Sequence, residues 1–439
     1  MQKSTIRTLA ALTAAGLLVT GCSRPDDSAE SQPSEAGHSA AEHSEAGHSE
    51  HEHHHDGVEA AAGQEEVAQL PGRILLSTDD ELVSLDAKTG EEIGRDEASG
   101  FKRLNPAGDG RHALVTRGDK FQAFDMGLIR QAHGDHFHYF VQDPALSDAT
   151  FDGLPHAGHV VSHDGYTALF SDGDGTAKIY KTDDMVADGT AADPVNTVDT
   201  GAPHHGVAVP LKDGSVVVTK GTEDERHTIV HLDADGKKLA ETTECPGVHG
   251  EAAAQNGNIV FGCEDGPVVF DGSDFHKVDV SAFAGKDGYQ RSGNAAGSEE
   301  SNIILADNKT DANAEHERPT SVALINAEDR TARTVDLDGS YWFRSLARGP
   351  LGEGLVLTTD GKLNVIDPDS AEVTDSIEAI SPWTENEEWQ VPGPILKAAN
   401  GYAYVTDANQ KELVIIDLFK KEVVKRVELE TPVTEMEVL

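Results

Sequence analysis

Basic residues are scarce in this 439-residue sequence, which has 35 Lys and Arg against 78 Asp and Glu and a formal net charge of −43. Nucleic-acid phosphates are bound through Lys and Arg, so this balance argues against a nucleic-acid partner. The excess of carboxylates favours the attraction of cations. Long hydrophobic runs are also missing: beyond the N-terminal segment, no stretch is apolar enough for a transmembrane helix, which needs about 20 such residues.

Cysteine is rare as well, with Cys22, Cys245 and Cys263 the three in the chain. None stands in a C-x-x-C pair, a spacing typical of zinc and redox motifs. We expect Cys245 and Cys263 to form a disulfide, because disulfides persist in exported proteins; two thiolate zinc ligands are the alternative. A Gly-x-Ser-x-Gly nucleophile motif and the Trp-Asp dipeptide of WD40 repeats are also absent.

The first 21 residues have the pattern of a lipoprotein signal peptide. Lys3 and Arg7 precede an apolar run from Leu9 to Val19, and small residues then lead to Cys22. The run is too short to span a bilayer comfortably, and the segment resembles the bacterial lipobox, whose cysteine becomes the acylated N-terminus. We expect an exported lipoprotein, anchored to a membrane in the periplasm or at the outer face of the cell membrane. An ordinary signal peptide with an incidental cysteine is the alternative.

Residues 22–66 are predicted to form a disordered arm rich in His and Glu. Ser, Ala, Gly, Glu and His dominate this segment, so it has too little apolar surface to fold. Such histidine-rich tracts are typical of metal binding, and imidazole suits zinc, copper and nickel. The duplicated Ser-Glu-Ala-Gly-His argues against an expression tag, and we expect weak binding at several sites. The histidines concerned are His38, His43, His48, His51, His53, His54 and His55.

The body of the chain, residues 67–439, alternates short β-rich runs with Asp-Gly, Asn-Gly and Gly-Glu turns. Strands at regular spacing, in repeats of about 40–50 residues, are typical of a β-propeller. We predict an all-β fold with a single β-propeller of eight blades, seven being the alternative count. The first repeat lacks its innermost strand, and residues 432–439 are expected to supply it and to close the ring.

Histidines recur in the loops that enter the innermost strands of three successive repeats. When the hairpin turns are aligned, His156 matches His205, and His249 is one position off; His159 and His204 are near neighbours. In a propeller these loops gather at one mouth of the central channel. We therefore expect imidazoles to converge there on a zinc ion, which takes three or four such donors.

A second group of candidate ligands lies in the run from His133 to His138. His136 and His138 share one face of a predicted strand, and His133 and Asp135 belong to the preceding turn. We place this strand at the outside of a blade, away from the channel mouth, with a long following loop through which it could reach the ring. A carboxylate such as Asp135 or Glu251 would complete a zinc shell.

The exported propeller, the arm and the histidines of the blades together resemble the AztD family of bacterial zinc metallochaperones. The resemblance covers most of the mature chain and depends on the arm, on residues 133–138, and on the runs Pro155-His156-Ala-Gly-His159 and Pro203-His204-His205-Gly206. It implies a protein that is not an enzyme, and that captures zinc and delivers it to the solute-binding protein of a zinc ABC transporter. The lipid anchor departs from the family, whose members are soluble periplasmic proteins.

Two other functions fit the same fold. One is an interaction scaffold that does not depend on metal, and the other is a hydrolase or lyase, since propellers host several enzyme activities. A site made of histidines alone favours copper by intrinsic affinity. The choice of zinc therefore follows from the resemblance and not from the residues.

Overall fold

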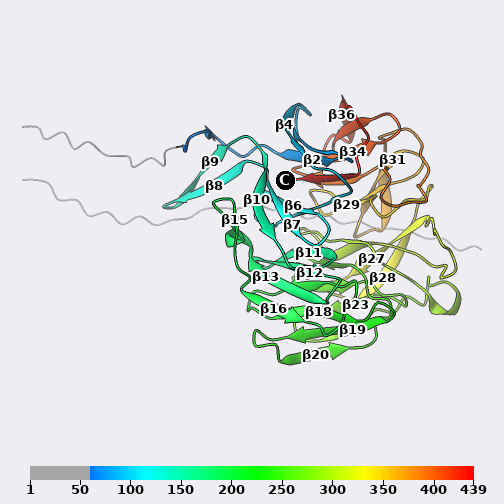
Figure 1. Ribbon diagram of the computed structural model, residues 1–439. Helices are drawn as coiled ribbons and strands as arrows, with labels where there is room; N and C mark the ends of the chain where they lie inside the picture. Colours follow the sequence, from blue (N-terminus) through cyan, green and yellow to red (C-terminus); the bar gives the residue numbers. More distant parts are fainter. Residues whose placement is uncertain (1–59) are drawn as a thin grey trace, which may run out of the picture. The chain divides into compact units, whose positions relative to one another are not determined.

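The computed structural model describes residues 60–439, which form an eight-bladed β-propeller (Figure 1). The predicted signal peptide, Cys22 and the histidines of the arm lie outside the described residues. Each blade is a four-stranded antiparallel sheet, named here from its innermost strand outward. Blades 1 to 4 are β37 (Glu435–Val438), β2 (Arg73–Ser77), β3 (Glu81–Asp86), β4 (Glu92–Glu97); β5 (Arg103–Pro106), β6 (His112–Thr116), β7 (Phe121–Asp125), β10 (Ala145–Phe151); β11 (Ala157–His163), β12 (Tyr166–Ser171), β13 (Thr176–Lys181), β16 (Asn196–Asp199); and β17 (Ala208–Pro210), β18 (Val216–Gly221), β19 (Arg226–Leu232), β20 (Lys238–Thr242).

The second half of the ring continues the same pattern. Blades 5 to 8 are β21 (Glu251–Ala253), β22 (Ile259–Phe261), β23 (Val268–Phe270), β24 (Phe275–Lys277); β25 (Ala295–Ala296), β26 (Ile303–Asp307), β27 (Ser321–Asn326), β28 (Thr331–Asp336); β29 (Leu346–Arg348), β30 (Gly354–Leu357), β31 (Lys362–Asp367), β32 (Glu372–Glu378); and β33 (Leu396–Ala399), β34 (Tyr402–Asp407), β35 (Glu412–Asp417), β36 (Glu422–Glu428). Two short 3-10 helices, η1 (Thr182–Asp184) and η2 (Lys286–Gly288), lie in connections.

The ring is closed by the C-terminal strand, as the sequence predicted. β37 pairs with β2, with Met436 opposite Leu76, and so provides the innermost strand of blade 1. On its other sides β37 contacts the innermost strands of blades 2 and 8. The C-terminus therefore lies beside the channel (Figure 1), and the edge of β2 is covered rather than exposed.

Apolar side chains hold the blades together in eight clusters, each formed by two neighbouring blades. Phe170 of blade 3, for example, packs against Val218 of blade 4, and Met436 of blade 1 packs against Leu413 of blade 8. The two middle strands of a blade, such as β34 and β35, are buried almost throughout, whereas the outer strand β36 is mostly exposed. Hydrophobic burial between sheets thus provides the main stabilisation of the ring.

Tight turns explain the Asp-Gly and Asn-Gly pairs of the repeats. Asp164 and Gly165 connect β11 to β12 with φ values of 52° and 81°, which is the backbone of a type I′ hairpin turn. Asn400 and Gly401 do the same between β33 and β34, with φ values of 52° and 82°. Both turns occupy the left-handed region that Gly and Asn tolerate best.

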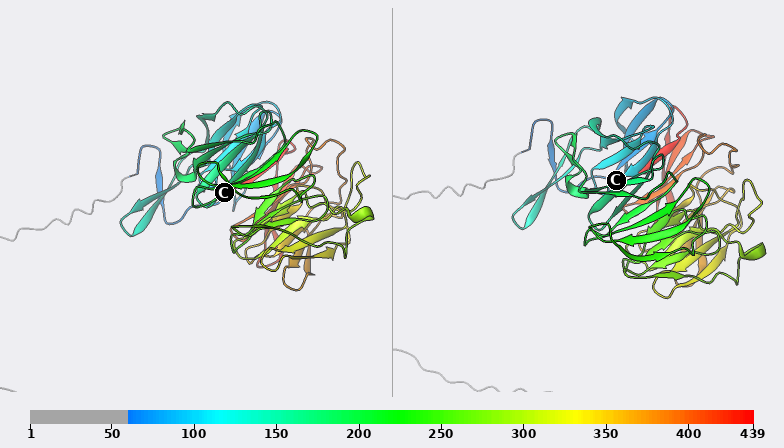
Figure 2. Two further views of the ribbon diagram at one scale, coloured as in Figure 1. Left: turned by 90° about the horizontal axis from the view of Figure 1, so that it is seen from below. Right: turned by 60° about the horizontal axis from the view of Figure 1, so that its bottom comes forward.

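One β-hairpin stands apart from the blades. β8 (Leu128–His133) and β9 (His136–Val141) are inserted between the third and fourth strands of blade 2, and β1 (Glu65–Val67) pairs with β9. Figures 1 and 2 show this three-stranded sheet projecting from the side of the ring. The predicted boundary at residue 67 falls inside β1, so Glu65 and Glu66 form a strand. A two-stranded sheet of β14 (Val186–Ala187) and β15 (Thr190–Ala191) completes the described elements.

The predicted disulfide is present between Cys245 and Cys263, whose Cα atoms are 4.9 Å apart. It joins the loop before β21 to the segment that follows β22, where the backbone N–H of His249 donates to the carbonyl of Gly262. The disulfide therefore restrains the loop that carries His249. Across residues 60–439, no helix has the length and apolar character needed to cross a bilayer.

Candidate metal sites at the channel mouth and on the hairpin

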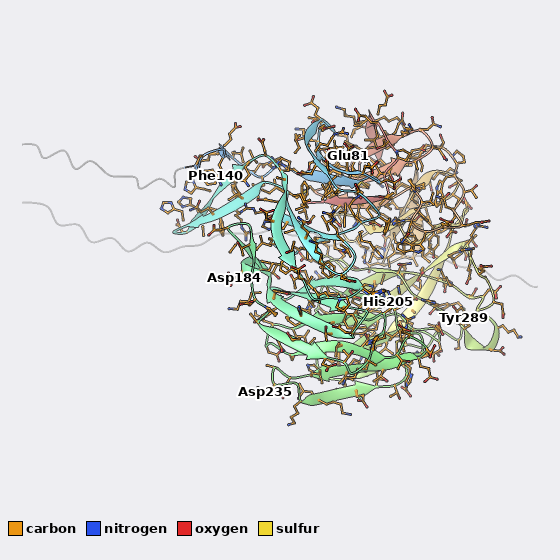
Figure 3. All side chains as sticks on the ribbon, in the orientation of Figure 1. Glu81, Phe140, Asp184, His205, Asp235 and Tyr289 are labelled. Carbon is orange, nitrogen blue, oxygen red and sulfur yellow. A yellow bond between two sulfur atoms is a disulfide. The ribbon has the colours of Figure 1, made fainter. Side chains whose placement is uncertain are left out.

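Three imidazoles from successive blades converge at one mouth of the channel. His159 lies in β11, and His205 and His249 lie just before β17 and β21, so each stands at the innermost strand of its blade. The ring centroids are 4.5 Å apart for His159 and His205, and 5.0 Å apart for His205 and His249. One nitrogen of each ring lies within 4.8 Å of the other two. Figure 3 shows His205 on the channel side of the green blades, and we call these three residues the channel triad.

Every ring of the channel triad has its Nδ1 atom occupied by a hydrogen bond. His159 Nδ1 donates to the carbonyl of Gly206 at 2.9 Å, and His249 Nδ1 donates to the carbonyl of Gly293 at 2.7 Å. His205 Nδ1 lies 2.5 Å from Asp172 Oδ2. Because carbonyl and carboxylate oxygens accept, the Nδ1 atoms carry the protons and the Nε2 atoms present lone pairs. Three lone pairs that face one another repel, unless a cation lies between them.

The spacing of these nitrogens fits zinc. His205 Nε2 and His249 Nε2 are 3.2 Å apart. Zinc–nitrogen bonds of about 2 Å in a tetrahedral shell place two ligand nitrogens about 3.3 Å apart. Oxygen acceptors on the opposite ring nitrogens are typical of zinc-binding histidines, whose tautomer and orientation they fix. The channel triad therefore has both the inner ligands and the outer partners of a metal site.

Asp172 is the outer partner that the sequence interpretation missed. Its Oδ2 bonds to His205, while its Oδ1 is buried and has no hydrogen-bond partner among the described residues. A Cβ atom at Gly158 would lie 2.3 Å from that Oδ1, so only glycine leaves room for the carboxylate here. The run Asp172-Gly173-Asp174-Gly175 after a strand was the available signal. Its pairing with a histidine of the next blade is a tertiary contact.

Burial keeps His159 and His249 in the neutral form that binds metal. Burial, followed by the positive charges of its neighbours, lowers the pKa of His159 well below its usual value of 6.5. Burial also lowers the pKa of His249 to about 3. Both imidazoles are therefore neutral at pH 7, and binding of a cation by them releases no proton.

These lowered pKa values predict that the metal-free protein loses stability in acid. Below pH 6.5 the unfolded chain takes up protons on these imidazoles, while the folded protein does so only near its own lower pKa. The contribution of His249 to the free energy of unfolding is thus fully present above pH 6.5. Below pH 6.5 this contribution falls by up to about 1.4 kcal/mol per pH unit. Between pH 6.5 and about 5, both the wild type and His249→Gln should lose free energy of unfolding. The loss should be smaller in His249→Gln, by up to about 2 kcal/mol, because the variant lacks this imidazole. Urea titrations in EDTA measure this difference, and equal losses would contradict it.

His156 and His204 do not join the channel triad. A bulge between Ala157 and Val160 shifts the register of β11, so that His159, and not His156, arrives beside His205. His156 is exposed with a φ of 52°, and it contributes its backbone carbonyl, which accepts from the N–H of Asp172. The alignment of His156 with His205 on their hairpin turns is therefore corrected, because that alignment did not allow for the bulge.

His204 is held by the fold. It is buried, its Nδ1 donates to the carbonyl of Ala202 at 2.9 Å, and its ring packs edge-on against Phe170. Glu251 lies outside the channel triad as well. Burial raises the pKa of Glu251 to about 8, so this carboxyl is protonated at neutral pH. A neutral carboxyl is a poor zinc ligand.

A second cluster comprises His133, His136 and His138 on the β8–β9 hairpin, and we call it the hairpin triad. His136 Nε2 and His138 Nε2 are 3.2 Å apart, the same separation as in the channel triad. His138 Nδ1 lies 2.8 Å from Glu66 Oε1 of β1, which gives this ring a carboxylate partner. The Nδ1 of His133 is buried without a hydrogen-bond partner among the described residues, as expected of an atom that binds a metal.

The predicted ligand Asp135 lies beside this cluster. Its Oδ1 is 3.3 Å from His136 Nδ1, and this hydrogen bond lowers the pKa of the exposed carboxyl. Asp135 is thus placed to orient His136 from outside the hairpin triad. Figure 3 shows Phe140, which follows the triad on β9, far from His205, so the two triads are separate sites.

The fold defines the chain as an eight-bladed β-propeller, and its two clusters of three histidines have the donor atoms of candidate metal sites. No family model matches the chain. In sequence it is 26% identical, over 360 residues, to the zinc chaperone AztD of Citrobacter koseri, and the match covers 77% of this chain and 79% of that protein. The resemblance predicted from the sequence is confirmed.

Solved structures share the fold. The crystal structure of Citrobacter koseri AztD has a TM-score of 0.72 at 22% identity and covers 84% of this chain and 98% of its own. Apo AztD of the same organism has a TM-score of 0.72 at 21% identity, with coverage of 84% and 98%. Dihydro-heme d1 dehydrogenase NirN, in complex with DHE, is more distant, with a TM-score of 0.51, 14% identity and coverage of 84% and 75%.

Proposed function

We propose that this protein is an extracytoplasmic zinc metallochaperone, which holds zinc at the channel triad and delivers it to the solute-binding protein of a zinc ABC transporter. The observation that carries the proposal is the convergence of three lone pairs whose opposite nitrogens are all hydrogen-bonded to oxygen. Three imidazoles suit copper and nickel as well as zinc. The similarity to AztD, a zinc chaperone, favours zinc.

The number of ligands suits delivery rather than permanent storage. Structural zinc sites are closed by four protein ligands, whereas three ligands leave one tetrahedral position open. A ligand of the acceptor protein enters at that position, and His159, His205 and His249 then release the ion one after another. Asp172 keeps His205 oriented throughout the exchange.

Capture is assigned to the hairpin triad and to the arm. The hairpin projects from the ring, and its triad includes the exposed His136, so it is accessible to zinc in solution. The histidines and carboxylates of the arm raise the local concentration of zinc through weak binding at several sites. We extend the proposal to export and to a lipid anchor at Cys22, on the basis of the signal-peptide pattern.

Zinc binding with counted stoichiometry tests this proposal. We compare the mature chain with a version that begins at residue 60, using competition with a chromophoric chelator. The shortened protein is expected to retain tight zinc at the channel triad and to lose only the weak sites. The zinc-loaded protein is also expected to transfer its ion to the zinc-free solute-binding protein faster than simple dissociation allows.

Two results would refute the proposal. The first result is a shortened protein that binds no tight zinc once the arm is removed. The histidines of the blades would then not be ligands, and the protein would be a scaffold with a metal-scavenging tail. The second result is zinc transfer to the solute-binding protein that is no faster than zinc dissociation into a chelator. The protein would then store zinc but not deliver it.

A further inference from the structure

An exposed tryptophan stands at the channel mouth in a setting that fixes its position. Trp389 lies in the long connection between β32 and β33, and 46% of its surface is exposed. The ring of Phe101 meets it edge-on at 5.1 Å, and the guanidinium of Arg103 lies 5.8 Å from its centroid. Arg344 Nη1 donates to its carbonyl at 2.9 Å. We call Phe101, Arg103, Phe343, Arg344 and Trp389 the mouth rim.

The mouth rim and the channel triad lie at the same end of the propeller. Innermost strands of a propeller all run in one direction, so the residues that precede or begin them gather at one mouth. Arg103 is the first residue of β5, and Phe343 and Arg344 precede β29, just as His205 precedes β17. β5, which begins at Arg103, contacts β11, which carries His159, so the rim borders the channel triad.

The mouth has charges of both signs. Glu387 and Glu388 are exposed beside Trp389, and Arg344 is paired with Glu435. Arg103, by contrast, begins β5 of blade 2 and Arg226 begins β19 of blade 4, on the two sides of the blade that carries His159. The chain has a formal net charge of −43, yet Arg103 is exposed on the rim. Arg226, whose guanidinium donates to the carbonyl of His205 at 3.3 Å, adds a second positive charge beside the triad. Arginines next to a zinc site repel the ion electrostatically, so they do not serve metal capture. They suit an anionic partner.

We propose that the mouth rim is the docking surface for the zinc-accepting protein, which presents acidic groups to Arg103 and Arg226 beside its own metal site. The inference rests on the proposed function, since it identifies where the acceptor binds. Trp and Arg are the residues that most often dominate binding energy at protein interfaces. Ligand exchange requires the two metal sites to come within bonding distance, so the docking surface must border the channel triad. A tryptophan that is already held in place loses little conformational entropy on binding.

Stopped-flow measurement of the rate of zinc transfer tests the role of the mouth rim in docking. The zinc-loaded, full mature protein is mixed with either of two acceptors: the zinc-free solute-binding protein of the zinc ABC transporter from the same cell, or a small chromophoric chelator. For Trp389→Ala, the second-order rate to the protein acceptor should fall by about tenfold or more, and the rate to the chelator should stay within about twofold. Phe419→Ala is the matched control. Phe419 is also exposed, but it lies in the turn from β35 to β36, at the opposite end of the blade.

A charge variant keeps the test decisive if Trp389→Ala folds poorly. Arg103→Glu alters an exposed side chain and should slow zinc transfer to the protein acceptor. The transfer rate of this variant should also depend less on ionic strength than that of the wild type. Equal transfer rates for the wild type, Trp389→Ala and Arg103→Glu would overturn the docking surface and leave the proposed function intact. Absence of accelerated transfer in the wild type would refute the proposed function itself, and the docking surface with it.

Discussion

Replacing His205 with alanine is expected to weaken zinc binding at the channel mouth by more than about 100-fold, beyond the 10–100-fold effect of outer partners. His205 lies between the other two rings, at 4.5 Å and 5.0 Å from their centroids, so its loss leaves two ligands. The measurement is a competition titration in a protein whose hairpin triad has been removed by His136→Ala and His138→Ala. This parent protein should bind one tight zinc, at the channel triad. The effect of His205→Ala on that zinc is then measured without a contribution from the hairpin triad.

Two companions to this variant separate ligation from general damage to the fold. Asp172→Asn removes the charge behind His205 and should weaken zinc binding by about 10–100-fold. His163→Ala is the matched control, because His163 lies in the same strand as His159 and its Nδ1 also bonds a carbonyl, that of Pro210, at 2.9 Å. It should bind zinc like the parent protein. Equal affinity in the His205 and His163 variants would show that the triad is not the site.

The largest effect on stability is expected from Glu435→Ala. Glu435 of β37 forms an ion pair with Arg344, and the side chains are 8% and 6% exposed. Removal of the carboxylate leaves a buried, unpaired guanidinium, which should cost about 3–5 kcal/mol. Urea denaturation followed by tryptophan fluorescence measures the loss. Replacement of both partners by apolar residues, Arg344→Met with Glu435→Leu, should recover most of it.

A surface pair provides the comparison for this result. Glu81 and Arg95 form an ion pair at 2.7 Å whose side chains are 30% and 31% exposed. Glu81→Ala should cost about 1 kcal/mol or less, because exposed pairs gain little. A Glu435→Ala protein that is no less stable than Glu81→Ala would mean that water reaches the buried pair.

The repeats made the fold predictable from the sequence. Period-2 strands with Asp-Gly and Asn-Gly turns specify hairpins locally, as at Asp164-Gly165, and a fixed repeat length leaves few architectures. The missing strand of the first repeat and the unassigned C-terminal run together predicted the closure by β37. Each of these inferences needed only local pattern and the rule that sheet edges are covered.

The site was harder to predict, because it depends on details that period and spacing do not encode. The bulge after Ala157 exchanges His159 for His156, and Gly158 within it was the one available signal, because a glycine inside a strand often marks a bulge. Asp172 reaches His205 of the next blade, a contact that exists only after the blades pack. The second cluster was correctly recognised as dense, but its strand belongs to an inserted hairpin and not to the outside of a blade.

Closure by β37 has different consequences for the channel triad and for the mouth rim. The channel triad comes from blades 3, 4 and 5, which follow one another in the chain, so its ligands can assemble as these blades emerge. The mouth rim joins blade 2 to blades 7 and 8, which become neighbours around blade 1 only after the last residues have paired with β2. A truncated chain would then hold metal without the surface proposed to release it. Pairing of β37 with β2 thus brings together parts of the mouth rim that are far apart in the sequence.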